Sequence, residues 1–311
     1  MHGAGRAFTP VEQRIDDAAR RVLARGPASG PRAALVEFLV FGAKQAWACV
    51  FGAALLIVIL AARLWYPDDA ALARNDLLTL AAVALQIAMV ATRLETGREL
   101  WVIVLFHVVG TGMELFKTDV GSWSYAADGV LRVGAVPLFS GFLYASVGSY
   151  MVRVHRLFDL RFSHWPPRWL TVTAAALIYV NFFSHHVLPD ARWLLLVAVG
   201  ALWGRSTMVY RVHRGSHRMP VLLAFCLVAF FLWLAENIGT FAGAWLYPDQ
   251  LTGWQLVSVS KFVSWLLLMI VSVVLVTLVY PPRKPDSAGP ERDASAAEPP
   301  PVNPREPAPQ P

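Results

Sequence analysis

The sequence predicts an all-α, polytopic membrane protein. Of its 311 residues, 56% are hydrophobic and 15% are charged, whereas soluble domains carry about 25% charged residues. Several apolar stretches approach or exceed the ~20 residues that a helix needs to cross a bilayer. The ~10-residue alternating segments of a transmembrane β-barrel are absent. The chain therefore falls in the class of helical membrane proteins.

About eight transmembrane helices are expected. They occupy residues 40–62, 76–92, 100–117, 135–152, 169–187, 191–210, 220–242 and 256–280. The membrane domain that contains them covers residues 33–280. A polar segment, residues 1–32, precedes it, and its apolar spacing over 11–24 is compatible with either a membrane-surface helix or a solvated tail. Residues 281–311 hold eleven of the 21 prolines, which predicts a disordered tail.

Features of individual segments support these assignments. Trp65 and Tyr66 follow the first helix, as expected for residues at a membrane interface. Pro137 falls in the first turn of the fourth helix, where proline is tolerated. The cysteines Cys49 and Cys226 lie inside predicted helices and do not suggest a disulfide framework.

The distribution of basic residues predicts the orientation. With eight crossings, 19 Lys and Arg residues lie on the side of the two termini and five on the other side. The positive-inside rule then places both termini in the cytoplasm. The net charge of +6 follows from this asymmetry, so the expected partner is the lipid bilayer and not nucleic acid. Protein partners are not indicated.

One pattern occurs twice, E-x3-T-x2-G-x-W-x-Y, at a constant offset of 122 residues. The first copy starts at Glu114 at the end of the third helix, and the second starts at Glu236 at the end of the seventh. The offset predicts two parallel four-helix halves, 33–152 and 153–280, related by an axis along the membrane normal.

Polar residues inside these helices are the candidate site, because ionisable groups in the hydrocarbon region are costly and often functional. Glu114, Glu236 and His107 are the candidate catalytic residues. The candidate substrate-binding residues are Trp123, Tyr125, Trp245, Tyr247, Asn237, Thr118, Thr240, Lys261, His185 and His186. No metal-binding spacing or cofactor motif is recognised.

Other interpretations of these residues stay open. Glu236 could pair with Lys261, and Glu114 with Lys117 or a histidine, purely to neutralise buried charge. The histidines at 185 and 186 could face lipid headgroups. The Trp-x-Tyr pairs could anchor the chain at the membrane surface.

Six stretches carry a resemblance to a known family. They are FGAKQAW (41–47), FHVVGTGMELFK (106–117), GSWSY (121–125), VPLFSGFLY (136–144), YVNFFSHH (179–186) and ENIGTFAGAWLYP (236–248). Over residues 38–280 the chain resembles the bacterial membrane family known as domain-of-unknown-function family 817. The resemblance implies an integral membrane protein and no activity.

The motif alone is also similar to the membrane carotenoid hydratases related to lycopene cyclases, which add water to polyenes or cyclise them. The chain departs from their pattern, which has Thr-Gly and Phe-Gly-x-Tyr where this sequence has Thr118-Asp119 and Val120-Gly121-Ser122-Trp123.

Three functions follow as hypotheses. The first is an intramembrane enzyme that hydrates or cyclises an isoprenoid or other lipid, with a glutamic acid as proton donor and aromatic rings stabilising a carbocation. The second is a proton-coupled transporter or permease, since buried carboxylates and histidines suit proton relay. The third is a non-catalytic membrane scaffold.

Overall fold

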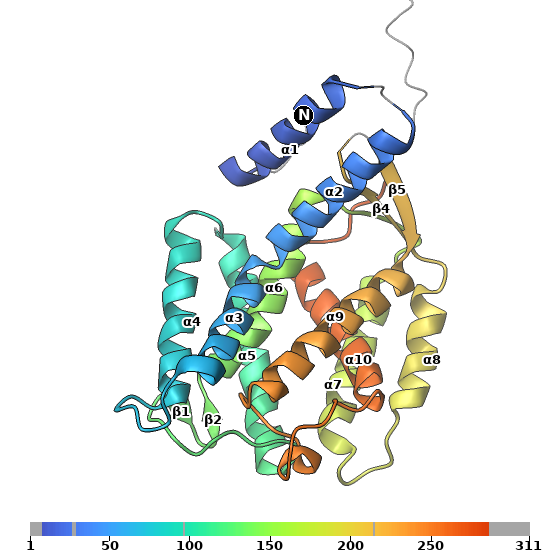
Figure 1. Ribbon diagram of the computed structural model, residues 1–311. Coiled ribbons are helices and arrows are strands. Elements are labelled where there is room, and N and C mark those ends of the chain that lie inside the picture. Colours follow the sequence, from blue (N-terminus) through green and yellow to red (C-terminus); the bar gives the residue numbers. More distant parts are fainter. Residues whose placement is uncertain (1–7, 27–28, 96, 214, 286–311) are drawn as a thin grey trace, which may run out of the picture.

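The computed structural model describes residues 8–26, 29–95, 97–213 and 215–285. Most of the predicted C-terminal tail therefore lies outside the described residues. The described chain is mainly helical (Figure 1). Its α-helices are α1 (Pro10–Ala24), α2 (Pro31–Ala48), α3 (Val50–Trp65), α4 (Arg74–Ala91), α5 (Arg98–Asp119), α6 (Phe139–Leu157), α7 (Arg168–Ser184), α8 (Arg192–Trp203), α9 (Val221–Phe241) and α10 (Ser260–Val279), with a 3-10 turn η1 (Pro248–Gln250).

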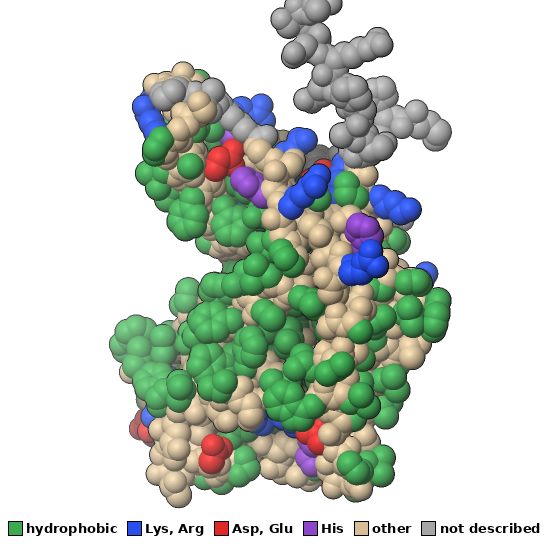
Figure 2. Space-filling view, turned by 90° about the vertical axis from the view of Figure 1, so that its right-hand side faces the viewer, with side chains coloured by type: hydrophobic (Ala, Val, Ile, Leu, Met, Phe, Trp, Pro, Cys, Tyr) green, Lys and Arg blue, Asp and Glu red, His purple; other side chains and the backbone are tan. Residues whose placement is uncertain are grey.

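Among the described residues, four helices are long and apolar enough to cross a membrane: α4, α5 from Glu99, α9 and α10. The pair α2 and α3 would make a fifth span if counted together, although the two helices bend by 65° at their junction. Helix α8 is apolar but has only 12 residues. Large hydrophobic side chains such as Phe38, Trp101 and Phe231 are exposed, and green side chains form a broad belt between the two ends of the molecule (Figure 2). These features are those of a multi-pass membrane protein.

Every predicted membrane segment contains a helix, but the first is not continuous. The predicted helix over 40–62 breaks at Cys49, where α2 ends and α3 begins. Beyond the break, α3 packs closely on α6, since a Cβ atom added at Gly52 would lie 3.2 Å from the Ser146 hydroxyl. The bend turns α2 away from α3 towards the end where α1 lies (Figure 1).

The connections between α6 and α7 and between α8 and α9 contain short strands. The short strands β3 (Arg161–Ser163), β4 (Thr207–Arg211) and β5 (Ser216–Pro220) form an antiparallel sheet in the order β3-β4-β5. The predicted helix over 191–210 therefore ends early, because Thr, Val and Tyr in β4 favour a strand once partners on both sides are present. A two-stranded ribbon, β1 (Arg132–Val133) and β2 (Val136–Pro137), precedes α6.

Helix α1 (Pro10–Ala24) covers the 11–24 segment in which the sequence allowed a helix, and it packs on α2. A capping box between Thr9 and Glu12 starts it. The Glu12 side chain is fully buried and accepts hydrogen bonds from Arg156 of α6, at 2.8 Å from Nη2. Lys44 of α2 pairs with Asp16 at 2.9 Å. The helix is thus held to the rest of the protein by buried ion pairs.

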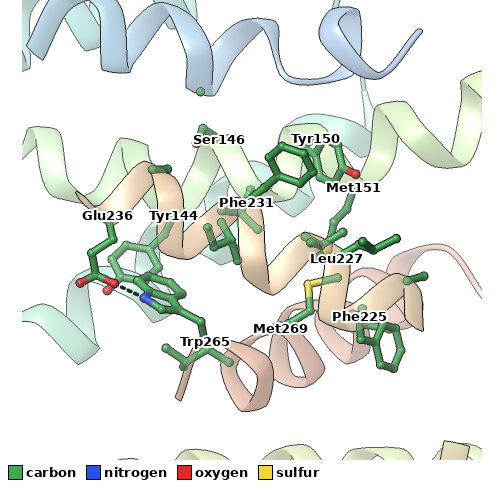
Figure 3. Close-up of a pocket in the computed structure, with 18 of the residues that line it drawn as sticks. Tyr144, Ser146, Tyr150, Met151, Phe225, Leu227, Phe231, Glu236, Trp265 and Met269 are labelled. Carbon is green, nitrogen blue, oxygen red and sulfur yellow. Dashed lines mark hydrogen bonds between the residues drawn. The ribbon is translucent and has the colours of Figure 1, made fainter. Parts of the chain in front are cut away.

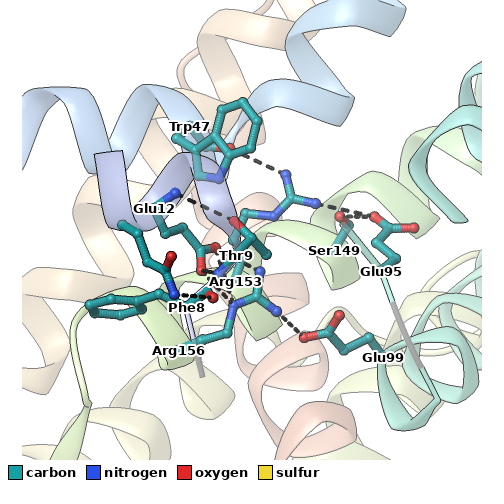
Figure 4. A network of polar contacts seen from close by, with 10 residues as sticks. Phe8, Thr9, Glu12, Trp47, Glu95, Glu99, Ser149, Arg153 and Arg156 are labelled. Atoms are coloured by element: carbon teal, nitrogen blue, oxygen red, sulfur yellow. Dashed lines mark hydrogen bonds and ion pairs between the residues drawn. The ribbon is translucent and has the colours of Figure 1, made fainter. Parts of the chain in front are cut away.

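The Arg156 contacts belong to a larger group near α1, called here the arginine network: Arg153, Arg156, Glu12, Glu95 and Glu99 (Figure 4). Arg156 bridges Glu12 and Glu99, and Arg153 lies 3.5 Å from Glu95. The loops that follow α5 and α9 lie at the opposite end of the molecule (Figure 1). The two motif copies therefore share one end, remote from the arginine network.

Candidate functional site

Both motif copies end their helices in the same way. Helix α5 stops at Asp119 and α9 at Phe241, and the glycine two residues later has positive φ, 71° at Gly121 and 64° at Gly243. The next amide bonds back into the helix in each copy, at 2.8 and 3.0 Å. This is a Schellman-type C-cap, in which glycine avoids the steric cost of a left-handed conformation.

The cap of the first copy reverses the chain so that its aromatic residues face the glutamate of the same copy. Trp123 Nε1 and the Tyr125 hydroxyl each donate to Glu114 Oε2 at 2.7 Å. The hydroxyl of Tyr144, on α6, donates to Oε1 at 2.7 Å. Glu114 is 4% exposed, so three neutral donors replace water around this carboxylate.

The second copy repeats the arrangement around Glu236, which is also 4% exposed. The Tyr247 hydroxyl donates to Oε1. Trp265 Nε1 of α10 donates to Oε2, as the dashed line in Figure 3 shows. Trp245 packs over Gly239, where an added Cβ atom would lie 2.2 Å from the ring. Each glutamate is thus bound by a tyrosine of its own motif and by an aromatic donor from the following long helix.

The two copies also contact each other. Ser124 and Leu246, which occupy equivalent motif positions, exchange both backbone hydrogen bonds at 2.9 Å in an antiparallel bridge. The rings of Trp123 and Tyr247 meet edge to face with centroids 6.2 Å apart. Two equivalent residues that pair with each other are related by a local two-fold axis. The two glutamates therefore lie near each other in equivalent surroundings.

A cavity of about 1270 Å³ adjoins both carboxylates, and its lining is mainly apolar. Helices α2, α3, α6, α9 and α10 contribute most of the wall. Figure 3 shows Glu236, Tyr144 and Trp265 at one end and Tyr150, Met151 and Phe225 further along. A volume of this size accommodates a lipid-sized ligand.

Basic residues line the same end of the cavity. Lys117 is 3% exposed, and its Nζ lies 2.9 Å from His186 Nε2 and 3.5 Å from His185 Nε2. Lys261 Nζ lies over the Tyr247 ring, 4.1 Å from its centroid. Neither lysine forms an ion pair with a carboxylate within the described residues. The pairings Glu114–Lys117 and Glu236–Lys261 considered from the sequence therefore form no salt bridge, although Glu236 and Lys261 act on each other electrostatically.

Groups in the loops have shifted pKa values. Burial, followed by the neighbouring Glu114 carboxylate, raises the pKa of Tyr125, and burial followed by Glu236 raises the pKa of Tyr247. Both phenols therefore stay protonated and able to donate at neutral pH. Desolvation, followed by the Lys117 ammonium, lowers the pKa of His186, so its ring is neutral at pH 7 and accepts from Lys117.

The structure brings most of the sequence-predicted residues together. Eight of them line the cavity: Glu114, Glu236, Trp123, Tyr125, Trp245, Tyr247, Lys261 and His185. The Trp-x-Tyr pairs, for which membrane anchoring was an alternative, face the glutamates instead. His186 does not line the cavity but contacts Lys117 and His185, which do.

The other predicted residues lie away from the cavity. His107 packs against Phe142 and Gly141. Thr118 donates to the Glu114 carbonyl oxygen, and Asn237 accepts from the Val257 amide. Thr240 accepts from Trp254. These side chains therefore form structural contacts: Thr118 and Asn237 bond backbone groups, and His107 and Thr240 contact other side chains or helices.

Two donors escaped the sequence analysis, Tyr144 and Trp265. Tyr144 follows Glu114 by 30 residues, whereas Trp265 follows Glu236 by 29. Because the two spacings differ by one residue, a search for repeats at the fixed offset of 122 residues does not align them. In the part of the chain that the structure describes, no group of three or more His, Cys, Asp or Glu residues could hold a metal ion.

Comparison with known proteins gives two relatives. The chain is 44% identical over 243 residues to the uncharacterized protein YoaT of Bacillus subtilis (strain 168), covering 78% of this chain and 91% of the relative. It is 33% identical over 95 residues to a phosphatidylcholine synthase of Bradyrhizobium diazoefficiens, covering 27% of this chain and 33% of that protein. No solved structure matches.

Residues 37–273 match the family described as "Protein of unknown function (DUF817)". This range contains both motif copies, both glutamates and the residues that bind them, as well as most of the cavity wall. The chain belongs to the DUF817 family of proteins of unknown function.

Proposed function

We propose that this protein binds a lipid in its central cavity and acts on it by acid–base chemistry, as a hydrating or cyclising enzyme for an isoprenoid or other unsaturated lipid. The observation that supports this most is the position of two buried carboxylates, Glu114 and Glu236, at one end of a cavity of about 1270 Å³ with mainly apolar walls. An apolar cavity selects a hydrocarbon chain, and the carboxyl groups supply the proton chemistry.

The proposed step begins with one glutamic acid in its protonated form. It gives its proton to a carbon–carbon double bond, whose electron pair forms the new C–H bond and leaves a carbocation on the other carbon. Trp123 and Tyr247 line the cavity and bond the carboxyl groups, and aromatic rings stabilise cations. Water then adds with loss of a proton, or a second double bond attacks and a proton leaves after ring closure. The carboxylate takes up that proton, so the enzyme returns to its starting state.

The tyrosine hydroxyls suit this chemistry. Tyr125, Tyr144 and Tyr247 contact the carboxylates directly, and a phenol can both donate and accept a hydrogen bond. A proton can therefore pass between a carboxyl group and a phenol without entering the apolar part of the cavity. His107, the relay suggested by the sequence, is not among the cavity residues.

The short similarity to a phosphatidylcholine synthase supports a lipid as the substrate class. It covers a third of that protein, so its reaction is not carried over. The motif likeness to carotenoid hydratases supports the hydration or cyclisation type of reaction by analogy alone.

The membrane setting is part of the proposal. We place the protein in a bacterial inner membrane, with eight crossings and both termini in the cytoplasm, from the charge asymmetry of the sequence. We also propose that α3–α6 and α7–α10 are duplicated halves. The equivalent C-caps at Gly121 and Gly243 and the bridge between Ser124 and Leu246 support this.

Lipid mass spectrometry tests the function. Membranes from the native bacterium, from a strain without the gene, and from that strain carrying wild type, Glu114→Gln or Glu236→Gln are compared. We expect the deletion strain to lose a lipid that is one water heavier than, or isomeric with, a species that accumulates. Wild type restores it, and the Gln variants accumulate in the membrane without restoring it. An unchanged lipid profile in the deletion strain would refute the enzyme.

The cavity also supports a second function, proton-coupled transport. Its lining extends from Gln45 and His155, near the arginine network, to Lys117 and His185 at the other end, so it reaches both ends of the molecule. Proteoliposomes with an imposed proton gradient would take up solute if this function is correct, and Glu236→Gln would abolish the uptake.

A further inference from the structure

Within the described residues, the lysines beside the two glutamates form no salt bridge. Lys117 is 3% exposed, and its Nζ contacts two imidazole nitrogens and the Phe182 ring, at 4.2 Å from the centroid. A buried ammonium group without a counter-ion is costly. No salt bridge within the described residues compensates its positive charge.

The nearby carboxylates form no salt bridge with the lysines and act on them only at longer range. Both oxygens of Glu114 and both oxygens of Glu236 accept hydrogen bonds from Trp and Tyr donors. Asp190, the acid next to the pair of histidines, bonds Arg192 at 2.5 Å. The oxygens of Glu114 and Glu236 are thus directed at aromatic donors, and the Asp190 carboxylate at Arg192.

A second lysine increases the positive charge at the same place. Lys261 lines the cavity with Lys117 and Arg192, and both Lys261 and Arg192 lie close enough to act on the Lys117 ammonium electrostatically. Lys261 Nζ rests on the Tyr247 ring. The lysines thus flank the polar end of an otherwise apolar cavity.

We propose that Lys117 and Lys261 bind the phosphate of a lipid whose hydrocarbon chain occupies the apolar part of the cavity. This inference rests on the proposed function, because it names the substrate class of the same site. A phosphate group offers several anionic oxygens, which matches two ammonium groups and the adjacent histidines better than a single carboxylate does. The 1270 Å³ of mainly apolar space then distinguishes a lipid phosphate from free inorganic phosphate.

The geometry assigns separate roles to neighbouring residues. The lysines hold the head of the lipid next to Glu114 and Glu236, so the first unsaturated part of the chain lies near the carboxyl groups. Lipid binding therefore depends on the lysines and not on the carboxyl groups.

Native mass spectrometry of the full-length, delipidated protein in detergent tests the inference. The probes are phosphatidic acid, diacylglycerol with the same chains, oleate and inorganic phosphate. We expect phosphatidic acid to bind at least about 10-fold more tightly than the other three. Equal binding of diacylglycerol or oleate would overturn phosphate recognition, and equal binding of inorganic phosphate would overturn the lipid.

Variants locate the phosphate. Lys117→Gln and Lys261→Gln should each weaken phosphatidic acid binding about 10-fold or more. The control, Arg63→Gln, removes an exposed cation that does not line the cavity and should leave binding unchanged. Lys261→Gln keeps the test decisive if Lys117→Gln does not fold. Unchanged binding in the Lys261 variant would refute the assignment.

Glu236→Gln separates the two proposals. It should bind phosphatidic acid as wild type does while failing to restore the lipid product. If it restores the product but the lysine variants lose binding, the proposed function fails and the phosphate site stands.

Discussion

The two ends of the molecule handle buried carboxylates in opposite ways. In the arginine network, Glu12 and Glu99 meet the guanidinium of Arg156 and Glu95 faces Arg153. At the other end, Glu114 and Glu236 are bound by Trp and Tyr side chains, and the lysines nearby remain unpaired. All five carboxylates are at most 8% exposed. Burial is therefore not what distinguishes the two ends.

The difference indicates which end holds the structure together. Ion pairs neutralise charge permanently, and those of the arginine network join α1, α5 and α6. Neutral aromatic donors orient a carboxylate without cancelling its charge, so the group stays able to exchange a proton. Unpaired lysines at the same end are available to a ligand. We therefore expect substitutions to affect mainly stability at one end and mainly function at the other.

The largest effect is expected from Arg156→Met, which removes the guanidinium that bridges the buried carboxylates of Glu12 and Glu99. We expect a loss of about 3–5 kcal/mol, measured as lower membrane accumulation and thermal unfolding in detergent at a lower temperature. Arg20→Met, on the exposed face of α1, is the control and should change little. The triple variant Arg156→Met, Glu12→Gln, Glu99→Gln should recover much of the loss; a triple variant as unstable as the single would contradict the electrostatic explanation.

Smaller losses of stability are expected when a tyrosine hydroxyl is removed from either motif copy, and their sizes should differ between the copies. Glu236 accepts hydrogen bonds from two side chains, and Tyr247→Phe removes one of them. Glu114 accepts hydrogen bonds from three side chains, and Tyr125→Phe removes one of these. We expect about 1.5–3 kcal/mol for Tyr247→Phe and less for Tyr125→Phe, from thermal unfolding in detergent. Tyr66→Phe, which loses an exposed bond to the Leu72 carbonyl, should cost least. A larger effect at position 125 would show that the number of donors does not set the ranking.

The smallest effects concern the C-caps. Gly121→Ala and Gly243→Ala place a Cβ atom on left-handed backbone, which costs about 1–2 kcal/mol, and the equivalent geometry predicts equal losses. The control is Gly42→Ala within α2, where an added Cβ atom meets nothing within 4 Å and alanine favours the helix by roughly 0.5–1 kcal/mol. Unequal losses in detergent unfolding experiments would show that the two caps differ in their surroundings.

Much of the candidate site was predictable because the motif is local. Glutamate, threonine, glycine and the aromatic pair fall within twelve residues, and the helix end with its glycine cap determines their relative positions. Tyr144 and Trp265 were not predictable, since they come from the next long helix and depend on how α5 packs on α6 and α9 on α10. The failure of Lys117 and Lys261 to pair with the glutamates was equally hidden, because spacing does not reveal that aromatic donors already fill the carboxylate oxygens.

The sequence by itself determined the membrane class, the positions of most helices and the repeated motif, because hydropathy, length and glycine caps act over one helix at a time. Only the tertiary structure decided that α2 and α3 bend at Cys49 and that β4 replaces the end of a predicted helix, since both depend on partners distant in the chain. It also decided which buried charges meet. A carboxylate is neutralised or left available according to the side chains that other helices bring within about 3 Å, and no local pattern contains that information.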